Sequence, residues 1–283
     1  MKKIILLIST LFVVTFLNAI FNDYEPSPRS RAMGGAVTSL SDNAYATFYN
    51  PASGIGLSNN FSFSYTKPFS NDFNTLSAAI FSMKLPKKAG VVSVGLQSFD
   101  VDYEDVNLLS EKVYAMSHSF RLLKDVHSEI NFGYGFNLYH LSIESMGNQT
   151  SFGFNAGMLA TLHNRTNVGF YIQNLNNPKV GENNDQALPQ KIAASISYIP
   201  FPTIITSFEL QKAINTDVDS KTEIHTGAEI TVYKYLKLRF GLRNNPAQYS
   251  MGFGLNVKNV LIDYAFATHT IGDTHQVSIG FKF

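Results

Sequence analysis

The 283-residue chain contains no cysteine and no tryptophan, and its formal net charge is only +1. The absence of cysteine excludes disulfide bonds, thiolate metal sites and a cysteine nucleophile. The near-zero charge gives no reason to expect a nucleic-acid partner. Long apolar runs are equally scarce, since only residues 4–17 form one. That run is too short for a membrane-spanning helix, which needs ~20 residues.

The apolar run predicts a leader instead. Lys2 and Lys3 precede it, and Asn18 and Ala19 follow it. This is the order of a secretory signal peptide, which we assign to residues 1–19. Leu17 is an imperfect residue three places before the cleaved bond, so the exact cleavage site stays open. No cysteine follows, which excludes a lipoprotein anchor. The alternative is a retained N-terminal helix.

What the chain has in quantity is aromatic residues, 23 Phe and 14 Tyr, in alternating patterns. At the C-terminus one face carries Val277, Ile279, Phe281 and Phe283, and the other carries Gln276, Ser278, Gly280 and Lys282. Strict alternation predicts a strand with one apolar and one polar surface. Ending on a terminal Phe, the strand resembles the closing strand of bacterial outer-membrane barrels. That resemblance implies that Phe281 and Phe283 form a signal for the barrel assembly machinery.

Similar alternation recurs upstream in segments of about nine to eleven residues, the length of a tilted membrane strand. Mean hydropathy is only −0.02, as expected of a membrane protein whose strands alternate. We predict an all-β fold, a transmembrane antiparallel barrel of about 14 strands over residues 60–283, in the bacterial outer membrane. A water-soluble β-sandwich would not need so many strands. The predicted strands are residues 60–67, 74–84, 90–99, 112–121, 129–142, 152–163, 166–173, 190–198, 203–211, 222–233, 235–243, 248–257, 259–268 and 275–283.

The connections divide into two classes. Short ones are expected at 85–89, 122–128, 164–165, 199–202, 234 and 258, and long ones at 100–111, 143–151, 174–189, 212–221 and 269–274. Short periplasmic turns and long external loops are typical of outer-membrane barrels. Charge follows the same division. The turns carry Lys87, Lys88, Lys124, Arg165, Lys234 and Lys258, and the loops carry Asp100, Asp102, Glu104, Asp105, Glu111, Glu182, Asp185, Asp217 and Asp219.

Residues 20–59 lie between the leader and the first strand. Gly34 and Gly35 permit a sharp bend or a close backbone contact. Ser41 or Asp42 can cap a short helix that runs to about Phe48, and Asn50-Pro51 should end it. Because this segment is too short to fold alone, we expect it to pack as a plug inside or under the barrel. Lumen-facing Gly133, Gly135, Gly252 and Gly254 would leave room for it.

The motif in this segment, Arg31-Ala-Met-Gly-Gly-Ala, then Asp42-Asn-Ala, then Tyr49-Asn-Pro-Ala, resembles the N-terminal signature of FadL-like and PorV/PorQ-like outer-membrane proteins. The resemblance implies a segment that occludes the lumen. It implies either of two functions. PorV-like proteins handle exported substrate proteins in type IX secretion, whereas FadL-like proteins take up long-chain fatty acids or other hydrophobic compounds. The chain is short for a FadL-like transporter and has no loop long enough for an extended capture surface, which favours the first. The motif residues of interest are Arg31, Gly34, Gly35, Asp42, Asn50 and Pro51.

Charged residues also point into the predicted lumen. Opposite charges on adjacent strands should form ion pairs across the barrel wall, which either hold the interior together or bind the plug through Arg29, Arg31 and Asp42. The predicted lumen-facing charges on the strands are Glu209, Glu229, Lys237, Arg239, Arg243, Asp263 and Lys282.

Catalytic and metal-binding signatures are missing from the sequence. His127 with Glu129, and His225 with Glu223, could share a strand face, but two groups do not complete a metal site. No nucleophile elbow or phosphate loop occurs. We therefore expect a protein that is not an enzyme and has no metal or cofactor. Its expected partners are outer-membrane lipid, the assembly machinery, and either secreted or secretion-system proteins or a hydrophobic small molecule.

Overall fold

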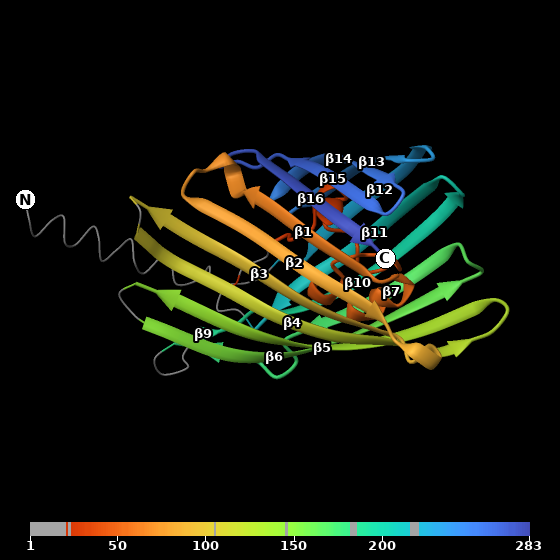
Figure 1. The fold of residues 1–283 in the computed structure, drawn as a ribbon, viewed down its shortest axis with the longest axis horizontal. Helices are drawn as coiled ribbons and strands as arrows, with labels where there is room; N and C mark the ends of the chain where they lie inside the picture. Colours follow the sequence, from red (N-terminus) through yellow and green to blue (C-terminus); the bar gives the residue numbers. More distant parts are fainter. Residues whose placement is uncertain (1–20, 22–23, 105, 145–146, 182–185, 216–220) are drawn as a thin grey trace, which may run out of the picture.

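A computed structural model describes residue 21 and residues 24–104, 106–144, 147–181, 186–215 and 221–283. The predicted signal peptide and the loop acids Asp105, Glu182, Asp185, Asp217 and Asp219 lie outside these residues. Within them, no helix has the length and apolar character needed to cross a membrane. The main element is a closed antiparallel barrel of β1 to β7 and β10 to β16, in which β1 pairs with β16. The predicted 14-stranded barrel is confirmed (Figure 1).

Every barrel strand pairs with its neighbours along the chain, as expected of an up-and-down barrel. Closure leaves no unpaired edge, so the strand N–H and C=O groups are satisfied even in lipid. The strands are β1 (Asn60–Lys67), β2 (Asn74–Lys84), β3 (Val91–Tyr103), β4 (Val106–Lys124), β5 (Ser128–Ile143), β6 (Gly147–Leu162), β7 (Thr166–Gln173), β10 (Gln190–Phe201), β11 (Ile204–Ile214), β12 (Glu223–Tyr233), β13 (Leu236–Asn244), β14 (Ala247–Val257), β15 (Val260–Ala267) and β16 (Thr274–Lys282).

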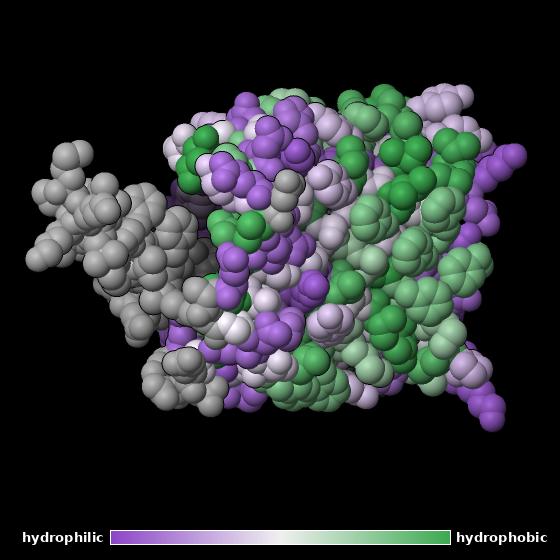
Figure 2. All heavy atoms as spheres, turned by 60° about the vertical axis from the view of Figure 1, so that its left-hand side comes forward, coloured by the Kyte–Doolittle hydropathy of each residue, from purple (hydrophilic) through white to green (hydrophobic). Residues whose placement is uncertain are grey.

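Alternation along each strand sets which side faces lipid. In β1, Ser62 and Ser64 are buried towards the lumen, whereas Phe61 and Phe63 are exposed on the outside. Figure 2 shows the resulting band of hydrophobic side chains, with hydrophilic side chains beyond it at both ends. The band is the surface that the hydrocarbon core of the membrane would cover.

Placing a charge within this band should destabilise the barrel. Phe63 lies in the middle of β1 with its side chain outside, so Phe63→Lys should cost about 2–4 kcal/mol of folding free energy in lipid. The folded fraction in lipid vesicles against urea would measure this. Ser64→Thr, on the lumen side of the same strand, is the matched control; equal losses in both variants would contradict the assigned orientation.

The strands that form one side of the barrel are longer than predicted. We predicted loops at 100–111 and 143–151, and both predictions are wrong. β3 continues to Tyr103, β4 already begins at Val106, and β6 already begins at Gly147. β4 has 19 residues, where a membrane strand needs about 9–11. These strands therefore extend past the hydrophobic band at the long-loop end, which we assign to the cell exterior.

The reason for the error is an inversion of polarity. On the outside, Leu138 and Phe152 are followed by His140 and Thr150, a directly opposed polar pair. On the inside, Tyr139 and Leu141 are buried with Val113 of β4. Above the membrane band the strands are thus polar outside and apolar inside. We assumed polar residues towards the lumen along each whole strand, so the prediction missed these outer parts of the strands.

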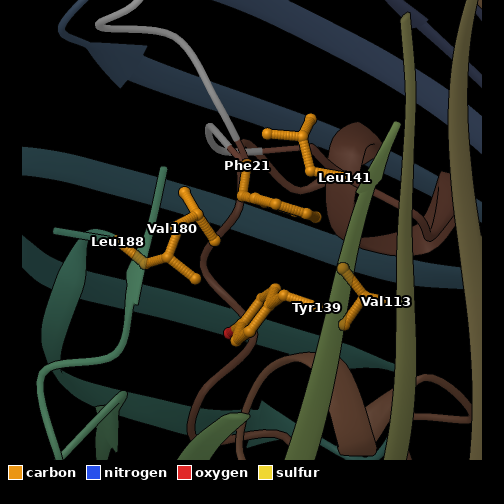
Figure 3. Close-up of a cluster of buried hydrophobic side chains, with 6 residues drawn as sticks. All are labelled: Phe21, Val113, Tyr139, Leu141, Val180 and Leu188. Carbon is orange, nitrogen blue, oxygen red and sulfur yellow. The ribbon is translucent and has the colours of Figure 1, made fainter. Parts of the chain in front are cut away.

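The long connection 174–189 contains a small two-stranded sheet of its own, β8 (Lys179–Val180) with β9 (Gln186–Ala187). Val180 and Leu188 of this connection pack against the apolar inner face of β4 and β5. Phe21 lies in the same cluster, and its ring meets Tyr139 edge-on with centroids 5.0 Å apart. Figure 3 shows these side chains converging from the N-terminal segment, the hairpin and the wall.

The N-terminal segment lies inside the barrel. It contains α2 (Pro28–Ala32), η1 (Ala46–Phe48) and η2 (Pro51–Gly56); α2 contacts β13 to β16, and η2 contacts β3 to β6. The segment therefore touches opposite parts of the wall (Figure 1).

The predicted helix between Ser41 or Asp42 and Phe48 is wrong. η1 has three residues, begins after Tyr45 and has no side-chain cap. Asn50-Pro51 does not end a helix but begins η2: Asn50 is its N-cap, and Pro51 occupies its first turn. Proline is favoured at that position because its missing N–H would have no helical partner.

Candidate functional site: the lumen and its N-terminal segment

The Gly34-Gly35 turn brings the N-terminal segment against the barrel wall. Gly34 has φ +64°, and a Cβ there would lie 2.7 Å from the backbone N of Leu242 and 2.9 Å from Thr226 O. Gly35 has φ +89°, and a Cβ there would lie even closer to Nδ1 of the His225 ring. Gly241 faces Gly34 from β13. Only glycine fits such positive φ values combined with backbone contact.

The four lumen glycines predicted from the sequence divide into two groups. A Cβ on Gly133 would meet the backbone of Ala52, and one on Gly252 would lie 2.7 Å from the Ala32 Cβ. Gly135 and Gly254 instead face groups of the wall, the Arg239 and Asp263 side chains in the case of Gly254.

A buried ion-pair cluster is centred on Glu229, whose side chain is 1% exposed. Its carboxylate accepts from Arg29 Nε at 2.9 Å, from Lys237 Nζ at 2.8 Å and from Arg239 Nε at 2.8 Å. Arg239 also donates to Asp263 at 2.5 Å. Such charge-assisted bonds are the strong class of hydrogen bond. Of the predicted lumen charges, four thus lie together, and Arg29 joins them to α2.

Asp42 extends this cluster towards solvent. Arg29 NH1 donates to its carboxylate at 2.8 Å, and the Asp42 side chain is 55% exposed. The Arg29 guanidinium lowers the pKa of Asp42 below its usual range. Since the folded pKa is depressed, the pair stabilises the fold above the unfolded pKa of ~3.9, and the stabilisation is lost as pH falls through the folded pKa.

We therefore expect a small acid-dependent effect from Asp42→Asn. It should lower stability by about 0–1 kcal/mol at pH 7, because an exposed pair is screened by solvent. The difference from wild type should shrink as the pH falls through the folded pKa of Asp42, because the carboxylate is then protonated and the pair is lost in the wild type as well. Urea unfolding in lipid vesicles at several pH values measures this, and a difference that grows in acid would contradict the assigned pair.

Glu209 and Arg31 form two further contacts between the N-terminal segment and the wall. Glu209 accepts from Thr38 N at 2.9 Å and Thr38 Oγ1 at 3.0 Å. Arg31 Nε donates to Gln276 Oε1 at 2.6 Å, and its NH2 donates to Glu25 O at 3.1 Å. The segment is therefore bound to β11 through Glu209 and to β16 through Gln276.

Asn50 links the two halves of the N-terminal segment to the wall. Its Nδ2 donates to Thr38 O at 2.8 Å and to Met158 O of β6 at 3.2 Å, and its Oδ1 accepts from Ala52 N at 3.0 Å. The residue is fully buried. Every hydrogen-bonding group of this side chain therefore has at least one partner.

Other predicted residues lie elsewhere. Arg243 donates to Glu223 at 2.5 Å, away from the Glu229 cluster. Lys282 is exposed at the end of β16. Phe281 is exposed on the outside, and Phe283 stacks on Phe81 with centroids 6.0 Å apart. Among the described residues, no group of three His, Asp or Glu is placed to hold a metal ion.

Several buried polar residues escaped the sequence reasoning. Glu25 accepts from Tyr49 Oη at 2.8 Å and Ser30 Oγ at 2.7 Å. Glu111, which we assigned to a loop, lies in β4 and accepts from the Phe21 N–H at 2.9 Å. Its position opposite Leu141 in the extended β4–β5 ladder was the available signal.

A cavity of about 60 Å³ lies between the N-terminal segment and the wall. Five aromatic side chains line it besides Phe21, together with carboxylates and amides. The lining includes Tyr24, Phe48, Tyr49, Tyr139, Tyr171, Glu25, Glu209, Lys191, Asn137, Gln97, Gln173 and Gln211.

Comparison with protein families matches residues 46–281 to the family described as type IX secretion system membrane protein PorP/SprF. Comparison with curated protein sequences gives no match. The family match supports the predicted resemblance to secretion-associated outer-membrane barrels. It begins after Asp42, so of the N-terminal motif it includes only the last part, Tyr49 to Ala52, with Asn50 and Pro51.

Among solved structures, the Pseudomonas putida toluene transporter TodX is similar, with a TM-score of 0.61 and 10% identity over 91% of this chain and 98% of that one. A Pseudomonas aeruginosa FadL homologue matches with a TM-score of 0.61 and 10% identity, covering 92% and 99%. At this identity the similarity establishes the fold, and it confirms the FadL-like barrel.

Proposed function

Because this chain belongs to the PorP/SprF family of type IX secretion system membrane proteins, we propose that it binds exported or secretion-system proteins at the outer membrane. It does so as a non-enzymatic barrel. Residues 24–58 act as a plug, and the partner is held on the external side. The family membership supports the secretion-system part of the proposal, and the contacts in the lumen support the mode of action.

The observation that carries the proposal is how the plug is held. Arg29 binds Glu229 of β12, Thr38 binds Glu209 of β11, and Asn50 binds the backbone of β6. Most of these groups are buried. Removing one partner of a buried ion pair strongly destabilises the folded protein. A plug held at so many points favours a barrel that presents a surface over one that passes cargo.

The extended strands supply that surface. β3 to β6 continue past the hydrophobic band, and their tip exposes Tyr103 and Leu108. Phe73, in the connection before β2, is also exposed, and its ring lies beside that of Tyr103 with centroids 5.6 Å apart. Asp102 and Glu104 lie beside them. Exposed aromatic residues within a charged rim are the composition that protein interfaces favour.

Co-purification from native outer membranes tests the proposal. The protein is extracted in mild detergent, and proteins and lipids in the same sample are identified by mass spectrometry. We expect secreted or secretion-system proteins at near-stoichiometric amounts, and their loss in Tyr103→Ala. Tyr233→Ala, an exposed tyrosine at the opposite end of the barrel, is the matched control. Recovery of no such protein with the wild type would contradict the proposal.

A second candidate function is passage of a hydrophobic small molecule. One observation favours it, namely the apolar cluster of Phe21, Leu141, Val180 and Leu188 beside the lumen cavity (Figure 3). Stoichiometric fatty acid or another apolar ligand in the same sample, without partner proteins, would support this candidate instead.

A further inference from the structure

Among the residues that the structure describes, three carboxyl groups buried in the barrel form no ion pair with a lysine or arginine. Glu25 is 9% exposed, and Glu111 and Glu209 are each 2% exposed. Glu229, equally buried, has three such partners. The contrast separates the Glu229 cluster, in which the charges are paired, from three carboxyl groups that accept hydrogen bonds from neutral donors.

Neutral donors only partly compensate these carboxylates. Glu25 accepts from Tyr49 and Ser30, and Glu209 accepts from Thr38. Burial of a charge is costly unless an opposite charge joins it. Glu25 and Glu209 both line the cavity of about 60 Å³, so a cation placed there would face both carboxylates.

An independent feature of the cavity also points to a hydrogen-bond donor. Asn137 lines the cavity and is 4% exposed, and its Oδ1 has no hydrogen-bond partner. The amide orientation follows from its neighbour: Tyr139 Oη donates to Asn174 Oδ1 at 2.8 Å, so it accepts from Asn137 Nδ2 at 3.0 Å. A buried carbonyl oxygen without a partner is uncommon, and a ligand with N–H groups would satisfy it.

The remaining walls suit a cation as well. Tyr24, Phe48 and Tyr49 contribute aromatic rings, whose faces attract ammonium and guanidinium groups. A water molecule needs about 10–15 Å³ of such volume, so the cavity has room for a few waters or for one small cationic group. Two basic residues face the same region, and a positive charge on either would weaken the binding of a cation. Lys191 lines the cavity, and His225, opposite Glu209 in the ladder, binds Glu223 through Nε2.

We propose that this cavity is a binding site for an organic cation, an ammonium or guanidinium group held between Glu25 and Glu209, with Asn137 Oδ1 accepting one of its N–H groups. The group is either that of a free amine or the side chain of a basic residue from a partner polypeptide. The inference does not depend on the proposed function, because it rests on the lumen alone.

Binding to the purified full-length protein in detergent tests the proposal. The probes are N-acetyl-arginine amide, for a basic side chain, and butylamine, for a free amine. N-acetyl-citrulline amide, in which a neutral urea replaces the guanidinium, is the matched neutral probe. Titration calorimetry should show saturable binding of at least one cationic probe and at least about tenfold weaker binding of the citrulline probe. The tighter cation identifies the source.

Variants localise the site. Glu209→Gln and Asn137→Leu should each weaken cation binding several-fold, while Glu144→Gln, an exposed external carboxylate, should leave it unchanged. Heat-modifiability on gels shows that each variant is folded, and Asn137→Leu, which leaves every carboxylate in place, serves if Glu209→Gln does not fold. Absence of saturable binding, equal binding of the citrulline probe, or full binding by both variants would overturn the proposal.

Discussion

Glu229→Gln should be the most destabilising single substitution in the lumen. It keeps the side-chain volume but removes the charge that Arg29, Lys237 and Arg239 share. Those cations would then face only Asp42 and Asp263. Removing one partner of a buried ion pair costs about 3–5 kcal/mol. Urea unfolding in lipid vesicles would measure the loss, and limited proteolysis would report release of the N-terminal segment.

The control for this substitution is Asp42→Asn, which removes an exposed carboxylate from the same cluster and should cost about 0–1 kcal/mol. The double variant Glu229→Gln with Arg29→Gln should recover part of the stability, because one of the uncompensated cations is gone as well. A loss below about 1 kcal/mol for Glu229→Gln would mean that the cluster does not hold the segment.

Gly241→Ala should displace the N-terminal segment with the smallest possible change. The added Cβ would lie within 2.7 Å of Gly34 Cα and closer still to the Gly34 nitrogen. Both contacts are with backbone, so no side chain can rotate away. Overpacking typically costs about 1–3 kcal/mol, and relief here requires the Gly34-Gly35 turn to move off β13.

Gly280→Ala is the matched control on β16. Its new Cβ would meet the side chains of Ser62 and Leu261 rather than the N-terminal segment, and Ser62 Oγ can rotate. We expect faster protease cleavage within residues 24–58 for Gly241→Ala only, measured on protein in lipid vesicles. Identical cleavage rates in the two variants would contradict the contact between β13 and Gly34.

Most of the barrel could be predicted from the sequence because alternation is a local property. Residues 60–67, 74–84 and 166–173 were predicted with the bounds that β1, β2 and β7 have. The method failed where the surroundings change. Above the membrane, inward Leu141 and outward His140 reverse the rule, so strands there were taken for loops.

The lumen was predictable only in part. Alternation assigned Glu229, Arg239 and Asp263 to the inside. Glu229 and Arg239 are opposed on adjacent strands, and Arg239 reaches Asp263 of β15 across Gly254 of the intervening β14. The contacts of Glu229 with Arg29, 200 residues away, and of Glu111 with Phe21 depend on how the N-terminal segment folds. Asn-Pro is compatible with either end of a helix. A residue before proline avoids the helical region, which ends a helix, whereas Asn as N-cap and Pro in the first turn begin one. No local signal at Asn50 decided between the two ends.

Ion conductance of the purified protein in planar lipid bilayers tests the central claim, that the N-terminal segment closes the barrel, most directly. The account predicts no stepwise current for the wild type, and current steps for Gly241→Ala, in which the segment is displaced from β13. Steady stepwise currents from the wild type, equal to those of the variant, would show an open pore and contradict it.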